Sequence, residues 1–92
     1  MELLNVHDDQ RRFQHLPATF GRLSFPAGTE LPETEHEQDE VSFIHTGRMR
    51  AVSGGREYEL AAGDVTFIPA GERHRAVVLE EVTLSYLLLE RR

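Results

Sequence analysis

Turn-forming residues interrupt this sequence at short intervals, and their spacing constrains the fold more than any other feature. Glycine- or proline-containing stretches separate the apolar segments from residue 26 to residue 72, about every 8 to 12 residues. The segments between them are rich in β-branched and aromatic residues and show no clear helical period. This pattern is typical of an all-β sandwich or barrel. The expected strands cover residues 18–25, 41–46, 48–53, 56–60, 65–68, 74–79 and 82–90.

Connections between these strands are predicted from the same residue types. Residues 26–32 contain two prolines and a glycine and are expected to form a loop. Gly47 is expected to end the strand 41–46, and the glycines of 53–55 to form a hairpin turn. Further turns are expected at residues 61–64 and 69–72.

The chain has 92 residues, which is enough for one domain with a single modest core. We expect an N-terminal arm over residues 1–17 and one barrel over residues 18–92. Within the arm, residues 6–16 fit either a helical turn or two, or an irregular segment with one short strand. No apolar run approaches the roughly 20 residues that cross a bilayer, and the first ten residues lack the features of a signal peptide. A cytoplasmic protein is therefore expected.

Charge and composition exclude several function classes. The formal net charge is −6, and all ten basic residues are arginines. Nucleic acids and anionic membranes attract positive surfaces, so neither is an expected partner. The absence of cysteine excludes disulfides, thiolate metal sites and cysteine nucleophiles. Acidic residues concentrate in residues 30–40, which suits either a bound cation or a solvated loop.

Three residues, His36, Glu40 and His74, are candidate metal ligands. His36 lies before a short bend, Glu40 opens the next expected strand, and His74 follows the turn at residues 69–72. Neighbouring strands lie about 4.8 Å apart, so inward side chains around such a bend can share one ion. Two histidines and one carboxylate leave other coordination positions open. The three side chains converge only if the sheet curls into a barrel, and an accidental grouping among five histidines is the alternative.

Strand alternation predicts which side chains face the interior. Counting from Glu40, the inward residues are Ser42, Ile44 and Thr46, and the outward residues are Val41, Phe43 and His45. The candidates for lining a pocket are Ser42, Ile44, Phe67 and Tyr86. Tyr86 is a general-acid candidate if it points inward, and an outward orientation is the alternative. His7 and His15, in the arm, are expected at the surface.

Two gapped motifs resemble the signatures of the cupins, and specifically small single-domain, RmlC-like cupins of the cupin 2 type. The first motif lies in "GTELPETEHEQDEVSFIHTG" (28–47), and the second in "GDVTFIPAGERHRAVV" (63–78). The matching positions are Gly28, His36, Glu40 and Gly47 in the first motif and Gly63, Pro69, Gly71 and His74 in the second. The resemblance covers residues 18 to about 90 and implies a double-stranded β-helix, also called a jelly-roll barrel.

The resemblance also implies a metal site, with two departures from the usual pattern. Typical members hold a divalent metal (Fe, Mn, Ni or Zn) with three histidines and one glutamate. Here Thr34 stands at the first histidine position and Val78 at the final asparagine position. Either His36, Glu40 and His74 hold the metal with a water beside Thr34, or metal binding is lost and the barrel binds an organic molecule directly. Glu33, Glu35, Glu37 and Asp39 are then expected to be solvated or to lie on the rim.

The implied functions follow from these two alternatives. In one, the protein is a metal-dependent cupin with a pocket for a small organic substrate, acting as a dioxygenase, an isomerase or a related enzyme. In the other, it is a non-enzymatic metabolite-binding or sensor cupin with a degenerate or absent metal site. Arginines 48, 50, 73 and 75 are expected to pair with Glu57, Glu59 and Glu72 on the outer face, and binding of an anionic substrate such as a carboxylate or phosphate is the alternative. A homodimer is expected because Val41, Phe43, Tyr58, Leu87 and Leu89 form more apolar surface than a small barrel can bury.

Overall fold

The computed structural model describes residues 1–4 and 17–90, which form seven β-strands. The described residues contain no helix, and thus none that could cross a membrane. Residues 5–16, with His7 and His15, lie outside the described part. The strands are β1 (Glu2–Leu3), β2 (Ala18–Phe25), β3 (Glu30–Thr34), β4 (Asp39–Ser53), β5 (Arg56–Ala61), β6 (Val65–Ile68) and β7 (His74–Leu89).

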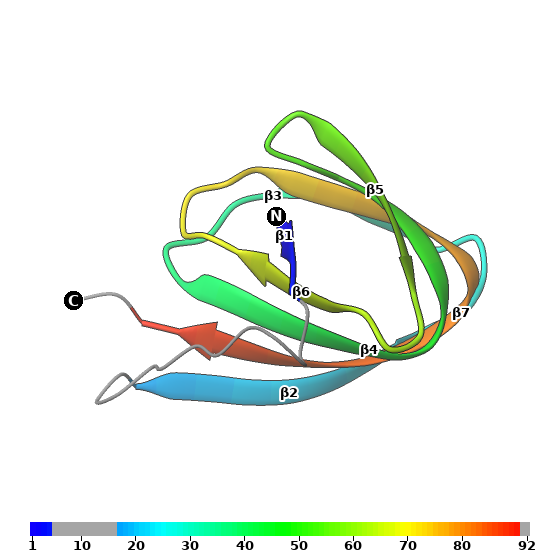
Figure 1. Cartoon of the computed structure of the whole chain (residues 1–92), viewed down its shortest axis with the longest axis horizontal. Helices are drawn as coiled ribbons and strands as arrows, with labels where there is room; N and C mark the ends of the chain where they lie inside the picture. The colour runs from blue at the N-terminus through cyan, green and yellow to red at the C-terminus, as the bar shows by residue number, and fades with distance from the viewer. Residues whose placement is uncertain (5–16, 91–92) are drawn as a thin grey trace.

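Two long strands, β4 and β7, build both walls of the barrel (Figure 1). Their paired halves Asp39–Ile44 and Leu84–Leu89 form one wall with β6 and β1 on one side and β2 on the other. Their other halves pair again, with β5 beside β4 and β3 beside β7. All pairings are antiparallel, and the bent strands close the two walls into an all-β jelly-roll barrel.

A glycine-centred irregularity carries β4 from one wall to the other. The register against β7 shifts between Ile44 and Met49, and Gly47 has φ 86°. A Cβ at Gly47 would overlap the main-chain carbonyl oxygen of Glu81, so only glycine fits here. The prediction that Gly47 ends a strand is therefore wrong, because the glycine bends the strand instead of stopping it. β7 likewise runs unbroken where two strands were expected.

The same irregularity changes which residues of β4 face the interior. Ser42 and Ile44 line the cavity as alternation predicts, but Thr46 is exposed. Beyond the register shifts, Met49 and Ala51 occupy the inward positions. Alternation counted from Glu40 thus fails after Ile44, because each extra residue in a bulge reverses the facing of the residues that follow. The main core cluster comprises Ile44, Met49, Ala51, Leu60, Val78, Val82 and Leu84.

A second cluster lies on the opposite face of the β6–β4–β7 wall. Val41, Val65 and Leu89 are buried there, with Phe43, Phe67 and Leu87 packed against them. Phe67 thus belongs to this outer cluster and does not line the cavity, which corrects the prediction. It sits one position from Thr66, whose side chain faces inward, so alternation turns Phe67 outward.

The expected homodimer stays a prediction, but its basis changes. Val41 and Leu89 are 5% and 3% exposed in the single chain, and Tyr58 packs against the main core. These residues therefore leave little surface for a second copy to cover. Among residues 1–4 and 17–90, the large hydrophobic residues that remain exposed are Leu3, Phe20 and Leu23.

Candidate metal centre

His36, Glu40 and His74 converge at one end of the barrel. One potential ligand atom from each lies within 4.8 Å of the others. His36 precedes β4, Glu40 is the second residue of β4, and His74 opens β7. The two imidazole rings meet edge to face, with centroids 5.1 Å apart and planes at 71°. The structure thus brings together three residues that span 39 positions of the sequence.

The backbone determines the tautomer of both histidines. The His36 Nδ1 lies 2.9 Å from the Gln38 carbonyl oxygen, and the His74 Nδ1 lies 3.0 Å from the Glu72 carbonyl oxygen. A carbonyl only accepts, so each Nδ1 donates its proton and each neutral ring keeps a free lone pair on Nε2. This is the arrangement that orients histidines as metal ligands.

An unpartnered nitrogen marks the centre of the group. Among the described residues, the His36 Nε2 is the buried side-chain polar atom without a hydrogen-bond partner. Its nearest carboxylate oxygen, Glu40 Oε1, is 3.6 Å away, too far for a hydrogen bond. Burying such an atom unsatisfied costs free energy unless another group binds it. A divalent ion between the two imidazoles and the carboxylate would provide that group.

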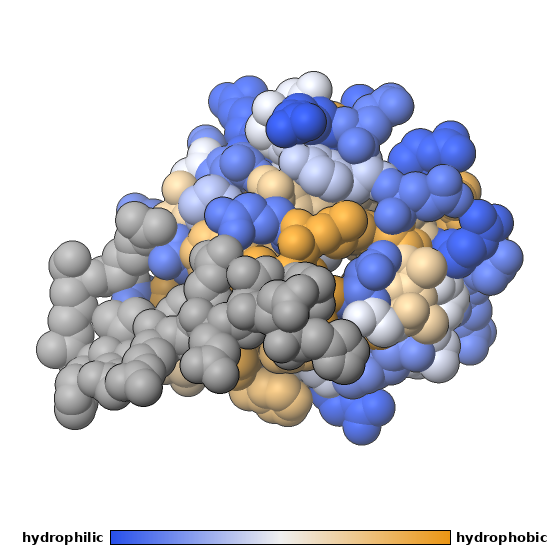
Figure 2. Space-filling view, in the orientation of Figure 1, coloured by the Kyte–Doolittle hydropathy of each residue, from blue (hydrophilic) through white to orange (hydrophobic). Residues whose placement is uncertain are grey.

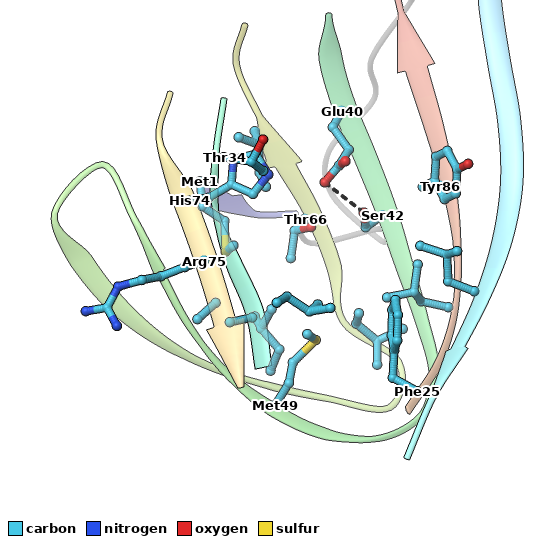
Figure 3. A pocket seen from close by; sticks show the side chains of 18 of the residues that line it. Met1, Phe25, Thr34, Glu40, Ser42, Met49, Thr66, His74, Arg75 and Tyr86 are labelled. Atoms are coloured by element: carbon cyan, nitrogen blue, oxygen red, sulfur yellow. Dashed lines mark hydrogen bonds between the residues drawn. The ribbon is translucent and has the colours of Figure 1, made fainter. Parts of the chain in front are cut away.

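Glu40 presents its carboxylate to the histidines and accepts a hydrogen bond from a neighbouring side chain on β4. The Ser42 hydroxyl donates to Glu40 Oε2 at 3.3 Å, as Figure 3 shows. One carboxylate and two neutral imidazoles form a mixed nitrogen and oxygen set with a single negative charge. This set suits iron, manganese, nickel or zinc.

Two hydrogen bonds hold the ligand-bearing bend against the turn that precedes His74. The Gly71 N–H donates to the His36 carbonyl at 2.8 Å, and the Ala70 N–H donates to Asp39 Oδ1 at 2.8 Å. Asp39 is 8% exposed, so the expectation that it is a solvated rim residue is wrong. Its carboxylate binds a backbone donor from a turn 31 residues away, a contact that no local pattern predicts.

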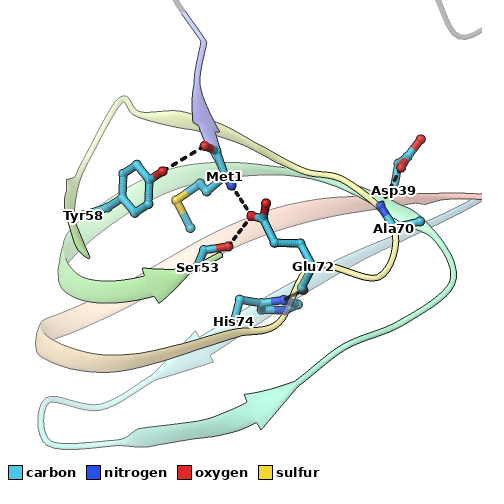
Figure 4. Close-up of polar contacts among 7 residues, drawn as sticks. All are labelled: Met1, Asp39, Ser53, Tyr58, Ala70, Glu72 and His74. Atoms are coloured by element: carbon cyan, nitrogen blue, oxygen red, sulfur yellow. Dashed lines mark hydrogen bonds and ion pairs between the residues drawn. The ribbon is translucent and has the colours of Figure 1, made fainter. Parts of the chain in front are cut away.

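A polar cluster that sequence reasoning missed lies behind His74 (Figure 4). The Glu72 carboxylate ion-pairs with the Met1 ammonium group and accepts a hydrogen bond from Ser53 at 2.6 Å. Tyr58 donates to the Met1 carbonyl at 3.1 Å. Burial by itself would raise the pKa of Glu72, but hydrogen bonds from the ammonium and Ser53 outweigh it and hold the pKa below its ordinary value. The cluster braces the residue whose carbonyl orients His74.

The arginine pairing matches the expectation for Arg48 and Glu59 and differs from it elsewhere. Arg48 pairs with Glu59 at 2.7 Å and with Glu80 at 3.0 Å. Arg73 lies 4.0 Å from Glu35, while Glu72 pairs with the amino terminus instead of an arginine. These exposed arginine pairs contribute little to stability.

Thr34, at the position where a further histidine would be usual, ends β3 directly opposite His74. It lines the cavity beside the ligand group. Its neutral hydroxyl is a poor ligand for a divalent metal.

A cavity of about 210 Å³ extends from the ligand group into the barrel (Figure 3). The polar residues on its wall are few, and Arg75 contributes only the base of its side chain because its guanidinium points away from the cavity. Ser42, Ile44 and Tyr86 line it as predicted. The remaining lining residues are Met1, Leu23, Phe25, Leu31, Pro32, Thr34, Glu40, Met49, Ala51, Leu60, Thr66, Ile68, His74, Ala76 and Leu84.

Tyr86 borders the cavity without pointing at the ligand group. Its register partner on β2 is Gly21, and a Cβ at Gly21 would overlap the Tyr86 ring and hydroxyl. The ring therefore lies over the glycine with its hydroxyl toward β2, as Figure 3 shows. This orientation does not support a role for Tyr86 as a general acid beside Glu40.

Apolar and hydrophilic residues are separated on the surface of one face. Figure 2 shows apolar residues near the centre of one face, with hydrophilic residues gathered around much of the rim. Glu33, Glu35 and Glu37 are exposed, as expected for rim residues.

Comparisons with known proteins agree with this architecture. An uncharacterized protein of Streptomyces coelicolor, SCO3923, is 36% identical over 55 residues, which are 60% of this chain and 52% of that protein. This chain thus spans about half of that relative's length. The structure also resembles a conserved protein of unknown function from Streptococcus pyogenes, SPY1581, with a TM-score of 0.77, 19% identity and coverage of 90% of this chain and 69% of the other.

A further solved structure is an RmlC-like cupin from Shewanella frigidimarina. It matches with a TM-score of 0.75 and 25% identity over 82% of this chain and 68% of the other. The model of the cupin domain family matches residues 21–90. These residues include both motifs and nearly all of the barrel, and the chain therefore belongs to the cupin domain family.

Proposed function

We propose that this protein binds one divalent metal ion through His36, Glu40 and His74 and receives a small organic molecule in the adjoining cavity. The observation that carries this proposal is the buried His36 Nε2, which has no partner among the described residues and faces Glu40 and His74. Both histidines are already held in the tautomer that a ligand needs. Binding would therefore require little rearrangement of these side chains.

A three-residue ligand set supports chemistry because it leaves coordination positions open. The ion, when bound, would act as a Lewis acid or as a site for oxygen, the two roles that isomerases and dioxygenases need. Ser42 holds the Glu40 carboxylate in place, and Thr34, opposite His74, lines the cavity at the position where a further histidine would be usual. The apolar walls exclude water from a bound molecule.

A second candidate function is binding or sensing of a metabolite without turnover. The orientation of Tyr86 favours it, because its hydroxyl points toward β2 and away from Glu40. Apart from the ligand group, the cavity offers neutral hydroxyls and no ionisable side chain directed inward among the described residues. Enzymatic turnover would then have to rely on the ion and Glu40 for proton transfer. Consumption of a bound molecule by the metal-loaded protein distinguishes catalysis from sensing.

Elemental analysis of protein purified without added metal tests the site. We expect about one metal ion per chain in the wild type, and loss of that ion in His74→Ala. The matched control is His45→Ala, because His45 is exposed and hydrogen-bonds to Ser85 away from the ligand group. Wild-type protein that holds no metal after incubation with iron, manganese, nickel and zinc salts would refute the proposal.

A further inference from the structure

We propose that the cavity selects a single-ring or short-chain molecule that has one polar edge, one apolar face and at most one ionised oxygen. This inference rests on the proposed metal-dependent function, because the ion would hold one end of the molecule. It adds the class of ligand and the side chains that choose it.

A pair of hydroxyls forms the polar side of the cavity. Ser42 on β4 and Thr66 on β6 are register partners, and both line the cavity. Along β4, Ser42 is the next residue after Glu40 whose side chain faces inward, about 7 Å farther along the strand. Thr66 lies beside Ser42 on the neighbouring strand. Figure 3 shows the two side chains on neighbouring strands beside Glu40. We call Ser42 and Thr66 the hydroxyl pair.

Within the hydroxyl pair, the two side chains have different surroundings. Ser42 donates its proton to Glu40, and Thr66 lines the cavity from the neighbouring strand. Thr66 is only 2% exposed, so bulk water does not surround it. A hydroxyl in such a place gains from a ligand that donates to it or accepts from it.

A pair of alanines forms the apolar side. Ala51 on β4 and Ala76 on β7 are register partners in the other wall of the barrel, and both line the same cavity. On β7, Ala76 is the next residue after His74 whose side chain faces inward. Methyl groups offer no hydrogen bond and take up little room, so they leave space for a flat apolar group. We call Ala51 and Ala76 the alanine pair.

Beyond both pairs the cavity is apolar. Ile44, Met49 and Leu60 line it and are at most 4% exposed. They would bury the part of a ligand that lies farthest from the ion, and such burial is favourable only for apolar groups.

Charge limits the ligand further. A divalent ion with Glu40 and two neutral imidazoles carries one uncompensated positive charge, which one ionised oxygen would neutralise. The Arg75 guanidinium points away from the cavity, and the Met1 ammonium is paired with Glu72. A second negative charge would therefore be buried without a partner, at a high cost in free energy. Dicarboxylates such as oxalate are selected against.

Size gives the last restriction. Cavities for drug-sized ligands have volumes of about 300–1,000 Å³, whereas this one has about 210 Å³. One substituted ring or a short branched chain fits such a volume.

Two hydroxamates that share one metal-binding head test the inference. Benzohydroxamate carries a ring and acetohydroxamate a methyl group, and calorimetric titration of zinc-loaded protein measures both affinities. We expect benzohydroxamate to bind about tenfold tighter or more, because its ring is buried between the two walls. Oxalate is expected to bind more weakly than either. A benzohydroxamate affinity no greater than that of acetohydroxamate, or tighter binding of oxalate, would overturn the inference.

Variants of the hydroxyl pair and the alanine pair test which cavity wall determines the relative affinity for the two hydroxamates. Ala51→Leu fills the apolar side, so the ratio of the two affinities should fall toward one, measured on protein that holds as much zinc as the wild type. Ala76→Leu, at a half-buried position, serves the same purpose if Ala51→Leu folds poorly. Thr66→Val removes one hydroxyl and should weaken benzohydroxamate binding by about two- to tenfold. An unchanged affinity ratio in both leucine variants would show that the alanine pair does not form the apolar side.

A metal-free arm separates this inference from the proposed function. Phenol has a ring for the alanine pair and a hydroxyl for the hydroxyl pair, and it needs no ion. Nuclear magnetic resonance titration of metal-free protein should show phenol bound at these walls, with binding lost in Ala51→Leu. Absence of iron, manganese, nickel and zinc binding would refute the proposed metal site alone, while absence of phenol binding at these walls would refute the class of ligand.

Discussion

At the candidate metal centre, hydrogen bonds with neighbouring residues orient the three candidate ligands. Ser42 holds Glu40, and the Gln38 and Glu72 carbonyls hold the two imidazoles. Glu72 makes a contact between residues far apart in the sequence. Its carboxylate, in the turn before β7, ion-pairs with Met1, which is 71 positions away. The orientation of His74 thus depends on a residue that would not itself contact a metal.

The Glu72 carboxylate should make stability depend on pH. Its pKa is lower in the folded state than the ordinary value of 4.5, so its contribution is fully present above pH 4.5. The contribution is lost as the pH falls through the folded-state pKa. Glu72→Gln should lower the free energy of unfolding by about 1.5–3 kcal/mol at pH 7, and the difference from wild type should shrink below pH 4.5.

Urea unfolding at several pH values measures this effect. The control is Glu57→Gln, since Glu57 is exposed on β5 and forms no ion pair with a described residue. A Glu72→Gln variant as stable as wild type at pH 7 would show that the Met1 contact adds nothing to the fold.

At the scale of elements, the bends in β4 and β7 determine how the two walls of the cavity form. Each long strand serves both walls, so the residues of one strand supply Glu40 and Ser42 to one side of the cavity and Ala51 to the other. Gly47 makes this change of wall sterically allowed in β4. A straight β4 would leave the cavity without its second wall.

Replacement of Gly47 by alanine should therefore be severe. The positive φ of 86° and the overlap with Glu81 together predict a loss of at least about 3 kcal/mol in the free energy of unfolding. Gly55→Ala is the matched control, because Gly55 has φ 78° but open space around it; it should cost only about 1–2 kcal/mol. Equal losses in the two variants, measured by thermal unfolding, would mean that the close approach to Glu81 is unimportant.

For the whole molecule, the candidate metal site joins segments far apart in the sequence. His36 and Glu40 enter from the segment around the start of β4, and His74 from the start of β7. Binding at such a site stabilises the fold, because the unfolded chain does not hold the three ligands together. The gain depends only on ligand concentration relative to the dissociation constant.

Zinc should therefore raise the free energy of unfolding in a saturable way. At a free zinc concentration one hundred times the dissociation constant, the expected gain is about 2.7 kcal/mol. Acidification should reduce the gain, because protons compete for the imidazole lone pairs. Thermal unfolding with and without zinc measures it in wild type, and the His74→Ala variant should show little gain. An equal gain in that variant would place the stabilising ion elsewhere.

The sequence by itself determined the local features of this protein, whereas the folded chain decided those that depend on distant residues. Turn spacing and β-prone segments predicted the strands 18–25 and 65–68 and the all-β class, and two motifs predicted the jelly-roll barrel and the grouping of His36, Glu40 and His74. These are local patterns, and strand pairing preserves them. The facing of Thr46, the outward position of Phe67, the buried role of Asp39 and the contact between Met1 and Glu72 came only from the tertiary structure. Bulges reverse alternation at places that depend on the opposite strand, and long-range contacts join residues whose separation leaves no periodic trace in the sequence.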